Sequence, residues 1–128
     1  MKAAVLRGKH DITLEDVPEP VCEPDGVVIR VKACGVCGSD MHVYHQGAPV
    51  AMIMGHELAG DVVEVGAKVK GVKKGERWAA ITGRGCGECY WCRQGEWIRC
   101  LKMELLGYGI PGAYAEYVIA PARFVHRV

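Results

Sequence analysis

Short apolar segments, separated by glycine and proline, run along the whole chain. Residues 2–7 are apolar, a turn is expected over 8–11, and residues 12–17 alternate between apolar and polar side chains. Such alternation is typical of a strand with one buried face, so the pattern predicts a hairpin whose second strand is half-buried. The prolines at positions 18, 20 and 24 then predict an extended loop, because proline cannot donate a hydrogen bond within a central strand.

The strongest strand prediction is residues 27–33, a segment rich in β-branched side chains. Gly35 and Gly38 end it, and residues 39–45 are expected to form a short helix with Ser39 or Asp40 near its N-terminus. A second strong strand, bent or bulged at an interior glycine, is expected at 58–65. Further strands are expected at 77–81, 113–119 and 124–128.

This pattern of many short strands with regular turns predicts a mainly β fold, either barrel-like or a sandwich. The chain has 128 residues, which favours a single domain over 1–128 that buries about two-thirds of its unfolded surface. One loop segment, residues 83–103, has too few apolar side chains to become ordered by packing alone.

Composition narrows the range of functions. Half of the residues are hydrophobic, and 16 basic residues nearly balance 15 acidic ones, for a net charge of +1. We therefore expect no nucleic-acid partner and no acidic membrane surface. The chain has no apolar run long enough to span a bilayer and no secretory signal pattern. Seven cysteines in such a chain predict a reducing, cytoplasmic location and metal chemistry.

Four of these cysteines are closely spaced within 83–103. Cys86, Cys89, Cys92 and Cys100 form the pattern C-x2-C-x2-C-x7-C. Four thiolates at this spacing can surround one Zn²⁺ with Zn–S bonds of about 2.3 Å and leave no position for water. The pattern therefore predicts a structural zinc site that pins the loop lobe.

Three other interpretations of the four cysteines fit their spacing less well. Disulfides fit poorly, because two residues between cysteines leave little room for the required geometry and seven is an odd number. An iron–sulfur cluster of the bacterial ferredoxin type would place its fourth cysteine after three residues and before a proline, whereas Cys100 follows after seven and precedes Leu101. A nucleic-acid-binding zinc ribbon would separate two cysteine pairs by about 15–20 residues.

A second group of metal-binding side chains follows the two strongest strands. Cys37, Ser39, Asp40 and His42 follow the first, and Gly55-His56-Glu57 precedes the second. A lone cysteine is more often a small buried hydrophobe than a ligand. Together, however, these residues offer a thiolate, imidazoles and carboxylates, the groups that a three-ligand catalytic zinc site needs.

These motifs carry a resemblance. The sequences G-x-C-G-S-D-x-H, G-H-E and C-x2-C-x2-C-x7-C, with Gly-Ala-Tyr-Ala-Glu-Tyr at 112–117, resemble the zinc-dependent medium-chain dehydrogenases, the alcohol dehydrogenase family with a GroES-like catalytic domain. The similarity covers the whole chain and is strongest to the sorbitol, threonine and butanediol dehydrogenases. It implies a GroES-like, partly open β-barrel with short helices and a zinc-pinned lobe at 83–103.

The resemblance also implies roles for individual residues. Cys37 and His56 would be catalytic zinc ligands, and Glu57 would lie beside the metal or exchange as a ligand. Asp40 would hydrogen-bond the His56 imidazole. Ser39 would contact the substrate hydroxyl, and His42 would pass its proton to solvent. The implied reaction is oxidation of a small alcohol or polyol through a zinc-bound alkoxide, with hydride transfer to NAD(P)⁺.

The chain also departs from the family pattern. Residues 107–112 match G-x-G-x-x-G, but Pro111 and a strand-like segment follow instead of a helix, so no residue is assigned to cofactor binding. We therefore expect a partial catalytic domain without its nucleotide-binding domain and without a third catalytic ligand, so that the catalytic zinc is held weakly or not at all. The isolated chain is expected to lack activity and to self-associate, as a homo-oligomer or otherwise, through the face that the missing domain would cover.

Two alternatives stay open at the level of sequence. The chain could be a zinc-stabilised β domain that acts as a binding or scaffold module without catalysis. It could also be a small redox protein with an iron–sulfur cluster.

Overall fold

The structure is a computed structural model that describes the backbone of residues 1–128 and every side chain except that of Arg84. Its elements, with η for 3-10 helices, are β1 (Lys2–Gly8), β2 (Asp11–Asp16), β3 (Gly26–Gly35), α1 (Gly38–Gln46), β4 (Met52–Ile53), β5 (Glu57–Val65), β6 (Arg77–Ala80), β7 (Gly83–Arg84), α2 (Tyr90–Arg93), η1 (Trp97–Arg99), β8 (Glu104–Leu105), β9 (Tyr117–Pro121), η2 (Ala122–Phe124) and β10 (Val125–Arg127).

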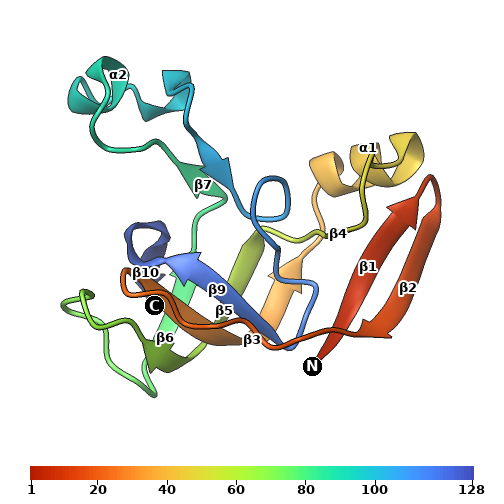
Figure 1. The fold of residues 1–128 in the computed structure, drawn as a ribbon, viewed down its shortest axis with the longest axis horizontal. Coiled ribbons are helices and arrows are strands. Elements are labelled where there is room, and N and C mark those ends of the chain that lie inside the picture. Colours follow the sequence, from red (N-terminus) through yellow and green to blue (C-terminus); the bar gives the residue numbers. More distant parts are fainter.

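The main sheet has the strand order β10-β6-β5-β3-β9, with every pair antiparallel. Its two edge strands, β9 and β10, are consecutive in the chain and are separated only by η2. A connection this short can join the two edges of one sheet only if the sheet curls strongly, and Figure 1 shows that curl. The expected mainly β, partly open barrel is therefore confirmed.

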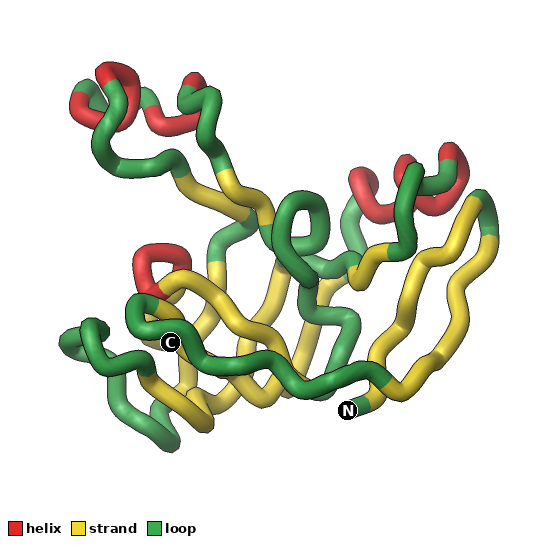
Figure 2. The backbone as a smooth tube through the Cα atoms, in the orientation of Figure 1, coloured by secondary structure: helices red, strands yellow, loops and turns green.

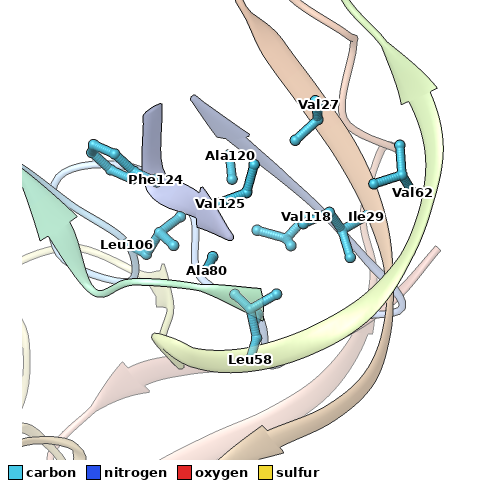
Figure 3. Close-up of a cluster of buried hydrophobic side chains, with 11 residues drawn as sticks. Val27, Ile29, Leu58, Val62, Ala80, Leu106, Val118, Ala120, Phe124 and Val125 are labelled. Carbon is cyan, nitrogen blue, oxygen red and sulfur yellow. The ribbon is translucent and has the colours of Figure 1, made fainter. Parts of the chain in front are cut away.

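The core fills the inside of this curl. Alternate residues of the strands point inward, because successive side chains of a strand face opposite sides. The buried side chains labelled in Figure 3 come from β3, β5, β6, β9, η2 and β10, together with Leu106 from the loop after β8. Phe124 is fully buried in η2. The core thus ties the two edges of the sheet to its centre.

A second sheet has the order β2-β1-β4. The expected hairpin is present, but the expectation that its second strand is half-buried is wrong. Ile12 is 43% exposed and Leu14 is 73% exposed. β2 pairs with β1 on one side only and no layer covers it, so the alternation in its sequence has no buried face to match.

The loop between β8 and β9 passes between the two sheets (Figure 2). It replaces the first half of the strand expected at 113–119, because β9 begins only at Tyr117. Successive backbone groups in this stretch bond to different partners. The Glu116 amide donates to the Lys2 carbonyl of β1, in the second sheet, at 3.1 Å, while the Glu116 carbonyl accepts from Val31 of β3, in the main sheet, at 2.9 Å. A segment that bonds alternately to two sheets cannot join one ladder.

Two local expectations are refined. The strand at 58–65 has an irregular register with β3, which has one extra residue, Lys32, near Gly60. The predicted bulge also lies within β5 itself, because Val63 has no partner between the pairs Val28–Glu64 and Ile29–Val62. The helix expected at 39–45 begins one residue earlier, with Cys37 at the N-cap position and Ser39 and Asp40 in the first turn, as expected. The longest helix has nine residues, and no helix in the described part of the chain is long and apolar enough to cross a membrane.

Gly112 lets the loop between β8 and β9 pack against the segment that leads to His56. A Cβ at this position would lie 2.2 Å from the Met54 carbonyl oxygen and 2.5 Å from that of Gly55. We therefore expect Gly112→Ala to lower the free energy of unfolding by about 1–3 kcal/mol, measured by denaturant unfolding. Gly109→Ala in the same loop is the control, because its Cβ would meet no atom closer than 3.9 Å. Equal stability of the two variants would contradict this packing argument.

Candidate metal centres

The loop lobe projects away from the main sheet, at the upper left of Figure 1. It consists of the short β7–β8 pair, α2 and η1. Within residues 86–103 only Cys100 is buried, and Leu101 is fully exposed. The lobe therefore has no hydrophobic core of its own, and some other interaction must order it.

The four cysteines of the lobe converge on one point. The sulfur atoms of Cys86, Cys89, Cys92 and Cys100 all lie within 4.8 Å of one another, and their thiols are free. Backbone amides point at these sulfurs: Cys86 and Lys102 each donate to Cys100 Sγ at 3.3 Å, and Cys89 donates to Cys86 Sγ at 3.4 Å. Four sulfurs with N–H donors around them fit one tetrahedral metal ion.

The four thiols differ in acidity. Backbone N–H groups of Glu88 and Cys89 lower the pKa of Cys86 to about 6, whereas burial raises the pKa of Cys92 to about 12. Since a metal binds thiolates, binding at this cluster must displace protons, above all the proton of Cys92. The affinity of this cluster for a metal would therefore rise with pH.

Gly85 leaves space for the sulfur cluster. A Cβ on Gly85 would lie 2.4 Å from Cys92 Sγ and 3.0 Å from Cys100 Cβ. The backbone before Cys86 thus passes so close to the sulfurs that no side chain can be accommodated there.

A second cluster forms where the N-terminus of α1 meets the chain before β5. Cys37 Sγ lies 3.1 Å from His56 Nε2. Ser39 Oγ completes a triangle, 2.9 Å from the same sulfur and 3.3 Å from the same nitrogen. Cys37, Asp40 and His56 are the second group of side chains in the described residues that could hold a metal ion.

Asp40 supports this cluster from behind. Its Oδ2 accepts a hydrogen bond from the Cys37 amide at 3.0 Å, and its Oδ1 lies 3.7 Å from His56 Nδ1. Asp40 is 2% exposed and His56 is 5% exposed. Asp40 Oδ1 and His56 Nδ1 are among the few buried side-chain atoms of the described residues without a hydrogen-bond partner. This arrangement leaves Nε2 as the nitrogen that faces Cys37 and can coordinate a cation.

The other predicted site residues lie around this cluster. Ser39 lies within it, but His42 and Glu57 are exposed and neither belongs to the group of close ligand atoms. The carboxylate of Glu57 lies against Gly35, where an added Cβ would meet Glu57 Oε2 at 2.6 Å.

Two tyrosines near the cluster were missed in the sequence. The Tyr114 hydroxyl donates to the Gly35 carbonyl at 3.1 Å, and burial together with the nearby Asp40 carboxylate raises its pKa. Burial, with Asp40 and Cys37 nearby, likewise raises the pKa of Tyr108. The one feature of the sequence that could have indicated them is that glycines near both tyrosines interrupt the pattern of strands.

The sequence of this chain is similar to those of known dehydrogenases. Residues 23–128 match the family model described as the alcohol dehydrogenase GroES-like domain. The zinc-type alcohol dehydrogenase B of Aspergillus flavus is 38% identical over 125 residues, which cover 94% of this chain and 29% of that protein. The L-threonine 3-dehydrogenase of Shewanella baltica is 37% identical, covering 95% of this chain and 38% of that protein.

Solved structures agree with these matches. One, described as a zinc-binding dehydrogenase from Sinorhizobium meliloti 1021 bound to NADP, superposes with a TM-score of 0.89 at 32% identity. The superposed region covers 99% of this chain and 38% of the Sinorhizobium protein. The chain therefore spans about a third of the length of the relatives that it matches.

The contact between Gly85 and the sulfurs gives a test of the lobe. We expect Gly85→Ala to weaken zinc binding by the four-cysteine cluster about 10–100-fold, because the added methyl would displace Cys92 Sγ. Competition with a chelating dye measures the affinity. Gly8→Ala is the matched control, since nothing lies within 4 Å of its Cβ. An unchanged affinity in Gly85→Ala would show that the sulfurs do not converge as described.

Proposed function

The chain belongs to the alcohol dehydrogenase GroES-like domain family, as its motifs predicted, and we propose that it is the zinc-binding catalytic domain of an NAD(P)-dependent alcohol or polyol dehydrogenase. The relatives named above are zinc-type and threonine dehydrogenases, and one solved relative binds NADP. Because those proteins are about three times longer, turnover is proposed for a polypeptide in which this domain is joined to a nicotinamide-binding domain.

The observation that carries the proposal is the triangle of Cys37, Ser39 and His56. A thiol sulfur and an imidazole nitrogen 3.1 Å apart, with a hydroxyl within 3.3 Å of both, combine ligands for a metal with a contact for a substrate hydroxyl. Cys37 and His56 are proposed to hold a catalytic zinc. When bound, this ion would supply Lewis-acid polarisation of an alcohol oxygen.

Asp40 is proposed to position His56. Its carboxylate lies 3.7 Å from Nδ1, so it favours the tautomer with the proton on Nδ1 and the lone pair on Nε2. The same carboxylate also accepts a hydrogen bond from the Cys37 amide. A single buried acid thus orients both proposed ligands, which holds their donor atoms at a fixed spacing.

Ser39 and His42 are proposed to move the proton that an alcohol loses on oxidation. Ser39 Oγ lies beside both ligand atoms and can donate to or accept from a substrate hydroxyl. His42 follows three residues later on α1 and is exposed, so it can exchange a proton with water. Glu57, exposed next to His56, is proposed as an outer neighbour of the metal or as an exchanging ligand.

The lobe cluster is proposed to have a structural role. Its four ligands are all cysteines and fill a tetrahedral shell, which leaves no position for substrate. The lobe has no core, so metal binding there would supply the free energy of ordering that packing does not.

Metal stoichiometry tests the two-site proposal. In excess zinc we expect the purified chain to bind about two zinc ions, the one at Cys37 and His56 more weakly, and the double variant Cys37→Ser/His56→Gln to bind about one while keeping its β-rich circular dichroism spectrum. Elemental analysis measures the count. Cys22→Ser is the control, because Cys22 lies outside both clusters. A wild-type chain with one zinc, unchanged in the double variant, would favour the scaffold function over the catalytic one.

The positioning role of Asp40 has a separate test. Asp40→Asn keeps an oxygen that can accept the Cys37 amide, but it removes the charge beside His56 Nδ1. We expect zinc affinity at the Cys37–His56 site to fall about 10–100-fold, measured by competition titration. Asp25 is exposed and belongs to neither group of possible metal ligands, so the control variant Asp25→Asn should bind zinc as the wild type does. Equal zinc affinity in Asp40→Asn and Asp25→Asn would show that Asp40 does not position the ligands.

A further inference from the structure

A pair of histidines lies outside both cysteine clusters. His10 occupies the turn between β1 and β2, and His45 lies in the last turn of α1. Although 35 residues separate them in sequence, His10 Nε2 and His45 Nδ1 are 2.8 Å apart. Both side chains are exposed, and the proposed dehydrogenase chemistry uses neither of them.

The backbone holds this pair in place. The His10 amide donates to the Tyr44 carbonyl at 3.0 Å, and the His10 ring lies 5.0 Å from the ring of Tyr44. His10 has φ of 60°, the only positive φ of a non-glycine residue in the described chain. Gly47, which ends α1, lies so close to Lys9 that an added Cβ would be 2.9 Å from the Lys9 nitrogen. The hairpin turn and the end of the helix are therefore docked, with the two imidazoles directed at each other.

The distance between the two nitrogens suits a shared metal ion. Two Zn–N bonds of about 2.0–2.1 Å, at angles between octahedral and tetrahedral, place the nitrogens about 2.9–3.4 Å apart. The observed 2.8 Å needs only a slight opening of the pair. The site also lies at the C-terminal end of α1, where the helix dipole favours a cation.

We propose that His10 and His45 form a binding site for a divalent transition-metal ion with a preference for imidazole, such as Ni²⁺, Cu²⁺ or Zn²⁺. Imidazole pairs disfavour Mg²⁺ and Ca²⁺, which prefer oxygen ligands. In the described residues no third histidine, cysteine or carboxylate joins the pair, so water would complete the shell. The bound ion would clamp the β1–β2 hairpin to α1, the helix whose other end holds Ser39 and Asp40.

Nickel titration of the zinc-loaded chain tests this site. We expect the side-chain NMR signals of His10 and His45 to broaden together at low Ni²⁺, while those of His126 on β10 stay unchanged. His10→Asn and His45→Gln should each weaken Ni²⁺ binding about 100-fold, because one ligand of a chelating pair is lost. Asparagine tolerates the positive φ at position 10, and glutamine is a good helix former, so both variants should fold.

The matched controls are His42→Gln on the same helix and His126→Gln on β10, and both should bind Ni²⁺ as the wild type does. Full Ni²⁺ affinity in either His10→Asn or His45→Gln would overturn the proposal, as would broadening of only one of the two imidazole signals. In that case the short contact is a hydrogen bond that shares one proton. Loss of the zinc ion at Cys37 and His56 would leave this result unaffected, so the two proposals fail independently.

Discussion

The backbone ladder between residues 53–55 and 112–114 is the constraint on which the rest of the structure depends. Gly112 donates to the Ile53 carbonyl at 2.8 Å, Ala113 to Gly55 at 2.9 Å and Tyr114 to Met54 at 3.0 Å. These bonds join the loop after β8 to the segment that leads from the small sheet into the main one. They also fix the chain immediately before His56. Together with the bonds of Tyr114 and Glu116 to β1 and of Glu116 to β3, they hold the two sheets side by side. They thereby support the position of His56, whose distance from Cys37 also depends on the pairing of β3 with β5.

The two cysteine-containing clusters depend on this architecture to different degrees. The lobe cluster is local: its four sulfurs come from fifteen consecutive positions, 86–100, and turns alone bring them together. This is why the spacing C-x2-C-x2-C-x7-C predicts it without knowledge of the fold. The second cluster joins the first turn of α1 to the chain before β5. Its residue types were visible in the sequence, but only the pairing of β3 with β5 places the helix next to His56.

The predictions from sequence that were wrong or missing all depend on tertiary packing. The alternation of Ile12 and Leu14 indicates a strand correctly but cannot tell whether a second layer covers it. The apolar residues at 113–116 have strand-like composition, yet their backbone bonds to both sheets in turn. The approach of Tyr114 to Asp40 and the contact between His10 and His45 join residues far apart in the chain. No local pattern indicates them, because they follow from how the hairpin and the loop dock.

A physical difference between the clusters follows from burial. Asp40 and His56 are buried with unpartnered atoms facing each other, and burying such groups costs free energy unless they are paired or bind an ion. The surrounding β5 core and the 112–114 ladder supply the free energy that keeps them in place, so this site is preformed. The lobe has no such support, since its sulfurs are held by turns and its large side chains are exposed. Ordering of the lobe and metal binding should therefore be one equilibrium, whereas at Cys37 and His56 the fold comes first and the metal second. A domain built in this way could lose or exchange its proposed catalytic ion without unfolding, whereas loss of the proposed metal from the lobe would disorder the lobe.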